Sequence, residues 1–164
     1  MQNGYAKCTL AGLDAIADHL GGLDPEQVDL LRGKLRIGIH RDVEVTDAAG
    51  EHRPLVSQAF CSALPVDYYR SSVPTSHWEA LGSMVLQAAY EATMLAAVLN
   101  ANRNASNIVL LTELGGGAFG NHPDWINAAI RRALALASEF AVDVRLVARD
   151  RPSSAIQKIA KDFS

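Results

Sequence analysis

Apolar side chains recur every three or four residues in two parts of the chain, which predicts helices with one buried face. The first helix covers residues 10–20 and ends at Gly21 and Gly22. Residues 76–102 are apolar on nearly every side and rich in alanine, which is typical of a long helix buried against a sheet. The second amphipathic helix covers residues 123–140, and its apolar stripe consists of Ile126, Ile130, Ala133, Ala137 and Phe140.

Polar residues mark two further helix starts. Asp24 followed by Pro25 predicts a short helix, because aspartate caps a helix and proline fits its first turn. Ser76 and Glu79 have the spacing of a capping box, so we expect the long helix to begin at Ser76. Residues 151–164 are expected to form a short polar helix.

Strand patterns fill the remaining segments. Residues 35–45 alternate apolar and polar side chains, and residues 55–64, 108–114 and 142–147 are largely apolar. From residue 55 onward the order is strand, helix, strand, helix, strand, which predicts an α/β layered domain with at least two parallel strands. The length of 164 residues, 49% of them hydrophobic, predicts a single domain over residues 1–164.

Charge and cysteine content narrow the expected partners and compartment. The formal charge is −3 and Lys and Arg do not cluster, so we expect neither nucleic acid nor an anionic membrane as a partner. Cys8 and Cys61 have no metal-ligand spacing, which predicts reduced thiols, no disulfide and no metal site. The sequence shows no secretion signal and no uninterrupted apolar run of about 18 residues. We therefore expect a cytoplasmic protein, or one delivered to a host cytosol.

The stretch IVLLTELGGGAFGNHPDWI, residues 108–126, is the strongest candidate for a binding site. It joins a strand to a helix through four glycines, Gly115, Gly116, Gly117 and Gly120. Glycines leave main-chain N–H groups accessible and permit positive φ angles, which suits an anion and above all a phosphate. A tight strand-to-helix turn that merely needs glycine is the alternative.

Two common phosphate loops do not account for this stretch. A P-loop requires Lys and then Ser or Thr after the last glycine, whereas Gly120 is followed by Asn121 and His122. The spacing of Gly115, Gly117 and Gly120 satisfies the dinucleotide fingerprint, but too few residues follow to complete that fold. The loop therefore needs another explanation.

The segment LTELGGGAFGNHPDWINAAI, together with VSQAFCSALPV and AAYEATMLAA upstream, resembles the macrodomain-like ADP-ribose-binding proteins. It is most similar to the branch related to ADP-ribosyl hydrolases and bacterial effector hydrolases. The resemblance implies a three-layer α/β/α fold around a mixed sheet, and a glycine loop that lines the diphosphate and the distal ribose, with Phe119 as the ring on the ribose. The implied ligand-binding residues are Gly115, Gly116, Gly117, Ala118, Phe119, Gly120 and Asn121.

The resemblance spans about residues 56–147 and corresponds to the later part of the family's domain, so we expect an incomplete sheet. The family's second loop near the distal ribose has no counterpart here. Three functions stay open: a hydrolase of ADP-ribosyl linkages on a modified protein, a non-catalytic ADP-ribose reader, and a structural half-domain that needs a partner segment. Because apolar surface would remain exposed, we expect a homo-oligomer or association with an upstream segment.

Two carboxylates are candidates for activating a water molecule. Glu113 stands at a strand end immediately before the glycines, where cleft residues of open α/β sheets lie, although a plain surface position is the alternative. Glu91 is isolated in the apolar helix, which predicts either a buried carboxylate with a raised pKa or a solvated helix edge. Gln58 and Trp125 are further candidates for ligand contact, although both residue types also serve packing. No cofactor is implied.

Overall fold

The computed structural model describes residues 4–49 and 53–164. The chain is mixed α/β, as the sequence predicts. In chain order the helices and strands are α1 (Leu10–Gly21), α2 (Pro25–Arg32), β1 (Gly38–Glu44), β2 (Leu55–Phe60), α3 (Glu79–Asn102), β3 (Ile108–Leu111), α4 (Pro123–Ala137), β4 (Asp143–Leu146) and α5 (Ser154–Asp162). Two short 3-10 helices, η1 (Val66–Tyr69) and η2 (Thr75–Trp78), precede α3.

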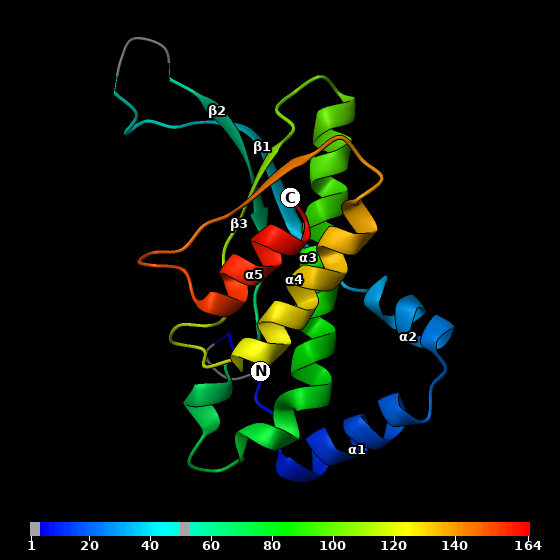
Figure 1. Ribbon diagram of the computed structural model, residues 1–164. Helices are drawn as coiled ribbons and strands as arrows, with labels where there is room; N and C mark the ends of the chain where they lie inside the picture. Colours follow the sequence, from blue (N-terminus) through cyan, green and yellow to red (C-terminus); the bar gives the residue numbers. More distant parts are fainter. Residues whose placement is uncertain (1–3, 50–52) are drawn as a thin grey trace.

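The longest helix, α3, packs along α4, and this helix pair forms the centre of the molecule (Figure 1). Gly82 of α3 lies against the indole of Trp125 in α4, where a Cβ atom at position 82 would come within 3.2 Å of the ring. Ala129 and Ala133 of α4 are fully buried. Small residues therefore let the two helices approach closely, and the stripe predicted for α4 forms its core face.

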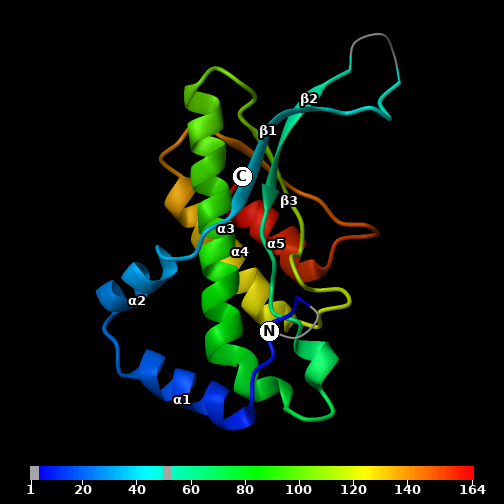
Figure 2. The same ribbon diagram turned by 180° about the vertical axis from the view of Figure 1, so that it is seen from behind.

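The strands form two separate two-stranded sheets. β1 and β2 pair antiparallel as a hairpin, and β3 pairs parallel with β4, so the predicted parallel neighbours are confirmed. Val109 and Leu111 of β3 are buried in the core, whereas Ile108 and Leu110 are 45% and 64% exposed. Since side chains alternate along a strand, helices cover one face of β3 and the opposite face is apolar and exposed. Figures 1 and 2 show the strands of the hairpin beside β3.

One predicted helix start and one predicted helix stripe agree with the structure. Asp24 caps α2 by accepting a hydrogen bond from the N–H of Gln27, and the side chain of Gln27 accepts one from the N–H of Asp24. The stripe of α4 agrees as far as Ala137, where the helix ends. Phe140 lies beyond that end and is 46% exposed, so it does not continue the buried face.

The prediction that the long helix begins at Ser76 is wrong. Ser76 belongs to η2, and α3 begins at Glu79 without a side-chain cap. Trp78 is fully buried at this junction and stacks on Tyr69 of η1, with ring centroids 6.1 Å apart. Packing of the indole, rather than a polar cap, therefore sets the entry into α3.

The helical run Thr75–Asn102 is, within the described residues, the one helix long and apolar enough to cross a membrane by length and composition. Core helices of water-soluble proteins meet the same criterion. Leu86, Tyr90 and Met94 of this run lie in the core with residues of α4. Packing in the core with α4 thus explains why these positions of the helix are apolar.

A charged contact fastens the β1–β2 hairpin to the end of α3. Arg103 follows α3 and donates through two guanidinium nitrogens to Asp42 of β1, with an Nη1–Oδ2 distance of 2.8 Å. Asp42 has φ +53° and lies where the register between β1 and β2 shifts. The hydrogen bond from Arg103 lowers the pKa of Asp42, so the contact is made by the carboxylate.

We expect Asp42→Asn to loosen the hairpin without unfolding the helices. Asparagine tolerates a positive φ but lacks the charge that strengthens the bond to Arg103. Amide hydrogen exchange should become faster in β1 and β2 and stay unchanged in α3 and α4. In the parent chain the contact is present above the ordinary aspartate pKa of about 3.9 and is lost as the pH falls through the lowered pKa of the folded state. After correction for the intrinsic pH dependence of amide exchange, acidification should therefore lower the protection factors of the hairpin as the variant does.

The matched control is Asp143→Asn. Asp143 accepts from Arg145 within β4 at 2.7 Å, and this bond likewise lowers the pKa of the carboxyl group. The pair is local to β4, so its loss should not change exchange in the hairpin. Equal acceleration of the hairpin by both variants would show that the Asp42 contact does not fasten it.

Candidate functional site

Tyr90 of α3 fixes the point where β3 runs into the glycine loop. Its hydroxyl donates to the carbonyl of Thr112 at 2.6 Å and accepts from the N–H of Leu114 at 2.8 Å. The ring is buried, and burial raises the pKa of Tyr90, so the phenol stays neutral and can do both. From the sequence, Tyr90 is expected only to be a core or partner-facing position of the long helix; the signal for its role was that a buried tyrosine needs a hydrogen-bond partner.

Two of the four loop glycines are required by the fold itself. Gly115 and Gly120 have φ angles of +76° and +64°. A Cβ atom at Gly115 would overlap the side chain of Ala63, and one at Gly120 would overlap the carboxylate of Asp67. Gly116 is less constrained, since its Cβ position lies 3.2 Å from the side chain of Ile126 in the core.

Gly117 differs from the other three glycines. No described atom outside its chain neighbours lies within 4 Å of the position that its Cβ atom would take, and its φ angle is not in the left-handed region. Neither packing nor backbone conformation within the described residues therefore requires a glycine there. The bare backbone at this position faces open space.

The main-chain N–H groups of the loop fall into two sets. Those that close the turn are paired: Gly116 with the carbonyl of Glu113 at 3.1 Å, Gly120 with that of Gly117 at 3.0 Å, and Asn121 with that of Gly115 at 3.0 Å. The N–H groups of Gly117, Ala118 and Phe119 have no hydrogen-bond partner within the described residues. Successive unpaired N–H groups in a turn are a common binding site for an anion.

The first turn of α4 offers less to a bound anion than the sequence suggests. His122 is the N-cap, and its ring accepts from the N–H of Asp124 at 3.3 Å, as its carbonyl does from Trp125 and Ile126. The side chain of Asp124 adds an exposed negative charge at the helix start. The N–H groups that could donate to an anion are therefore those of the loop rather than those of the helix end.

Asn121 and Trp125 lie beneath the loop rather than on its surface. Asn121 is 3% exposed, and its Nδ2 donates to the carbonyl of Leu64 at 2.7 Å, which ties the loop to the segment before η1. Its Oδ1 has no partner among the described residues. Trp125 is 8% exposed and packs on Gly82. Their contacts are thus structural ones.

The tip of the loop carries an aromatic cluster. The rings of Tyr5, Tyr68 and Phe119 contact one another edge to face, with centroids 5.2 to 5.9 Å apart. The N–H of Asp67 in η1 donates to the carbonyl of Phe119 at 3.0 Å. Arg70, whose side chain is 68% exposed, pairs with the Asp67 carboxylate at 2.6 Å and offsets its charge beside Gly120.

The two candidate carboxylates are not brought together. Glu113 is exposed directly before the loop. Glu91 is half-buried on α3, and its carboxylate lies 3.4 Å from Arg132 of α4, which also pairs with Asp29 of α2 at 2.7 Å. Since Glu91 follows Tyr90 by one residue on a helix, it points to a different side. Of the two, Glu113 is beside the glycine loop.

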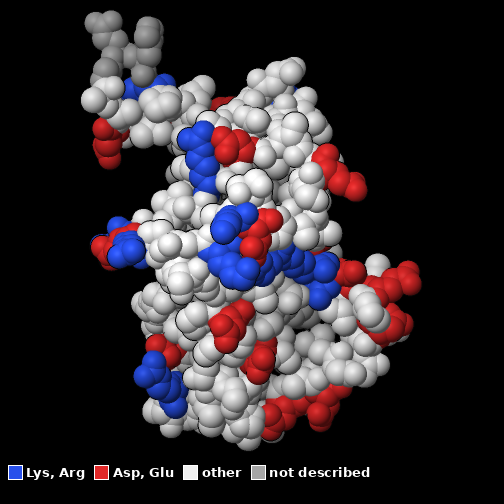
Figure 3. Space-filling model, in the orientation of Figure 1, with Lys and Arg blue, Asp and Glu red and all other residues white. Residues whose placement is uncertain are grey.

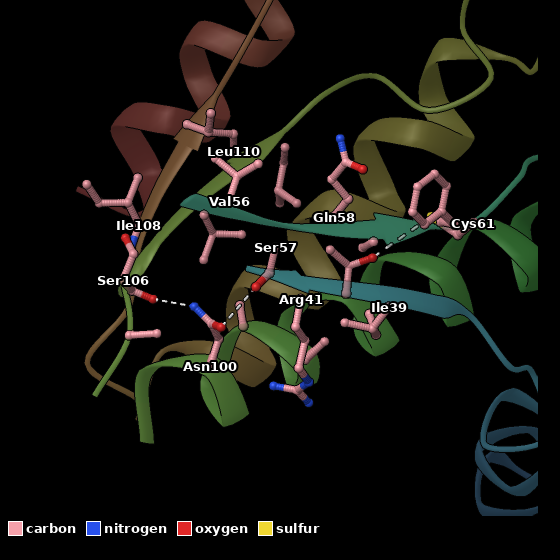
Figure 4. Close-up of a pocket in the computed structure, with 18 of the residues that line it drawn as sticks. Ile39, Arg41, Val56, Ser57, Gln58, Cys61, Asn100, Ser106, Ile108 and Leu110 are labelled. Atoms are coloured by element: carbon pink, nitrogen blue, oxygen red, sulfur yellow. Dashed lines mark hydrogen bonds between the residues drawn. The ribbon is translucent and has the colours of Figure 1, made fainter. Parts of the chain in front are cut away.

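Gln58 lies in a groove of about 620 Å³ between β2 and β3 (Figure 4). Leu114 also lines this groove, so it reaches the start of the glycine loop, while Gln58 itself belongs to the wall formed by β2. Cys61 lines it as well and lies 3.9 Å from the hydroxyl of Thr93. Burial raises the pKa of the Cys61 thiol, which keeps it protonated and a poor nucleophile.

Charge does not mark a binding face on the side shown in Figure 3. Arg131 pairs with Asp162, which Lys158 also contacts, and Arg132 pairs with Asp29. Basic and acidic side chains therefore lie next to each other across α4, α5 and α2. In the part of the chain that the structure describes, no group of three His, Cys, Asp or Glu side chains is placed to hold a metal ion.

No protein-family model matches the chain, and it has no match among curated proteins or among solved structures. What the loop binds must therefore be inferred from its own residues. The features that bear on this are the three unpaired N–H groups, the open space at Gly117 and the position of Glu113.

The two kinds of glycine predict effects of different size on the free energy of unfolding. Gly120→Ala should lower the free energy of unfolding by about 1–3 kcal/mol, because alanine must hold a positive φ against the Asp67 carboxylate. Gly117→Ala should change it by less than about 0.5 kcal/mol, since the new methyl group meets open space. Urea denaturation of both variants measures the difference. Equal losses would mean that the loop is not held as described.

Proposed function

We propose that the loop of residues 115–121 binds the diphosphate of ADP-ribose, free or attached to a protein. The observation that carries this proposal is the pairing of two properties at the loop tip. Gly117 has no internal reason to lack a side chain, and its N–H is the first of three that have no partner among the described residues. A ligand that accepts hydrogen bonds and needs close backbone approach supplies the reason for both.

The rest of the loop is consistent with a nucleotide-sugar ligand. Phe119 places an aromatic ring next to the three donors, and Tyr68 extends that apolar surface. Arg70, which follows the adjoining η1 helix, is an exposed cation paired with Asp67. An aromatic ring beside phosphate donors suits the apolar face of a ribose, which agrees with the role that the sequence resemblance implies for Phe119.

We further propose that the chain belongs to a three-layer α/β/α domain of the macrodomain type. We also propose that it hydrolyses the linkage between ADP-ribose and a modified protein. Glu113 is the candidate general base, because it is exposed directly before the loop and so adjoins the proposed diphosphate site. The loop would hold the diphosphate while Glu113 removes a proton from the water that attacks C1 of the distal ribose. The bond from C1 to the modified side chain breaks, and that side chain leaves with a proton from solvent. A non-catalytic reader uses the same loop without this step.

Binding is tested with ADP-ribose and adenosine. ADP-ribose should raise the melting temperature by mass action, reaching about 2.7 kcal/mol of stabilisation at a hundred times the dissociation constant, and adenosine, which lacks the diphosphate, should do much less. Gly117→Val should fold and lose this stabilisation, because a branched side chain blocks approach to the N–H groups.

The control for this variant is Gly21→Val, since Gly21 at the end of α1 also has open space around its Cβ position and an ordinary φ. It should respond to ADP-ribose like the parent chain. Unchanged affinity in a folded Gly117→Val protein, measured by calorimetry, would overturn the phosphate-loop proposal.

Catalysis is tested separately, by release of ADP-ribose from an ADP-ribosylated protein. Glu113→Gln should bind ADP-ribose normally and turn over about a hundredfold to ten-thousandfold more slowly, the usual contribution of a general base. Glu91→Gln should keep the parent rate, because that carboxylate is engaged with Arg132. Binding without turnover in the parent chain would identify a reader, and a slow Glu91→Gln variant would reassign the base.

A further inference from the structure

The groove between β2 and β3 is bounded by main chain on both sides. Its walls are β2 and β3, and its floor is the small-residue side of α3, including Thr93, Ala96 and Ala97 (Figure 4). At one end Asn100 closes it by donating to the carbonyl of Ser106 at 2.8 Å. At the other end it reaches Tyr90 and Leu114, where the glycine loop begins.

The edge of β3 that faces the groove has unpaired main-chain groups. The carbonyls of Asn107, just before β3, and of Leu111 accept from N–H groups at positions 143 and 147, at 2.9 and 2.8 Å. The main-chain groups of odd-numbered residues therefore face β4. Successive residues of a strand direct their main-chain groups to opposite edges, so those of Leu110 face the groove. They have no partner within the described residues.

The opposite wall of the groove, β2, also has an unpaired edge. β2 pairs with β1 on one edge, and the described residues place no strand on its other edge. Apolar side chains from both walls are exposed at the groove: Leu55 (61%), Val56 (39%), Phe60 (57%), Ile108 (45%) and Leu110 (64%). Two free strand edges with apolar side chains between them are an arrangement that proteins normally cover.

We propose that this groove receives one extended strand of a partner polypeptide. Only a peptide main chain offers donors and acceptors at the repeat of a strand on both of its edges, and such a strand would pair with β2 on one side and β3 on the other. The two small sheets then become one sheet in the order β1, β2, partner, β3, β4. This inference does not depend on what the glycine loop binds.

A second copy of the chain does not supply this strand. The occupant needs two free edges, and each described strand already has one edge paired, β1 with β2 and β3 with β4. A separate segment of about five residues matches the usual length of a strand. Its side chains facing α3 must be apolar and large, because Ala96 and Ala97 leave the space above the floor unfilled.

The test uses the whole chain and a blocked seven-residue peptide in which isoleucine and threonine alternate between terminal lysines. Amide hydrogen exchange at Leu110 is followed with and without the peptide. Bound peptide should slow exchange at Leu110 by at least about tenfold, because the N–H gains a strand partner, while exchange in α4 is unchanged. The same peptide with alternate nitrogens methylated keeps the side chains, loses the donors on one edge, and should not protect.

Ala96→Leu gives the matching change in the protein. It places a larger side chain on the floor of the groove and should weaken the protection, whereas Ala135→Leu, at an exposed position of α4, should not. Protection by the methylated peptide, or protection that survives Ala96→Leu, would show adhesion to apolar surface and overturn the proposal. So would protection of Leu110 in the chain without peptide, either in a dimer seen by light scattering or in a monomer whose β2 and β3 pair directly.

Discussion

The two hydrogen bonds of the Tyr90 hydroxyl set the position of β3 relative to the longest helix. A buried phenol is costly without partners, and here it satisfies the carbonyl of Thr112 and the N–H of Leu114 just where regular strand pairing stops. The same residue forms the end of the groove between β2 and β3. The glycine loop and the groove therefore share one anchor, and a shift of α3 against β3 would alter both.

Close packing of α3 on α4 makes that anchor rigid. Gly82 of α3 leaves room for the indole of Trp125. After Trp125, the core face of α4 consists mainly of alanine and isoleucine. The loop is thus held from three directions: Tyr90 at its start, Asn121 from beneath, and η1 through the bond between Asp67 and Phe119. The exposed N–H groups at its tip are presented by a fixed frame, which is what a binding site for a charged group needs.

The sequence predicted the helices and the parallel strands because their apolar periodicity is local. It could not place contacts between distant segments, and these decide the details of the site. The overlap at Gly120 comes from Asp67, the burial of Asn121 comes from its bond to Leu64, and the start of α3 is set by Trp78 stacking on Tyr69. The glycine run in itself indicated a backbone-lined loop, but it could not distinguish glycines needed for the turn from the one left open to solvent.

That distinction also separates what the fold needs from what a ligand needs. Gly115 and Gly120 would be retained in any protein that makes this turn against Ala63 and Asp67, so their presence argues only for the turn. The unpaired edges of β3 and β2 also serve either the fold or a partner. Nothing in the helix core requires them to face an apolar groove. Main-chain groups without partners occur both at the loop tip and along this edge, on either side of Tyr90. Because a partner bound on either side would act on the same short segment, filling the groove would steady the strand end from which the loop departs.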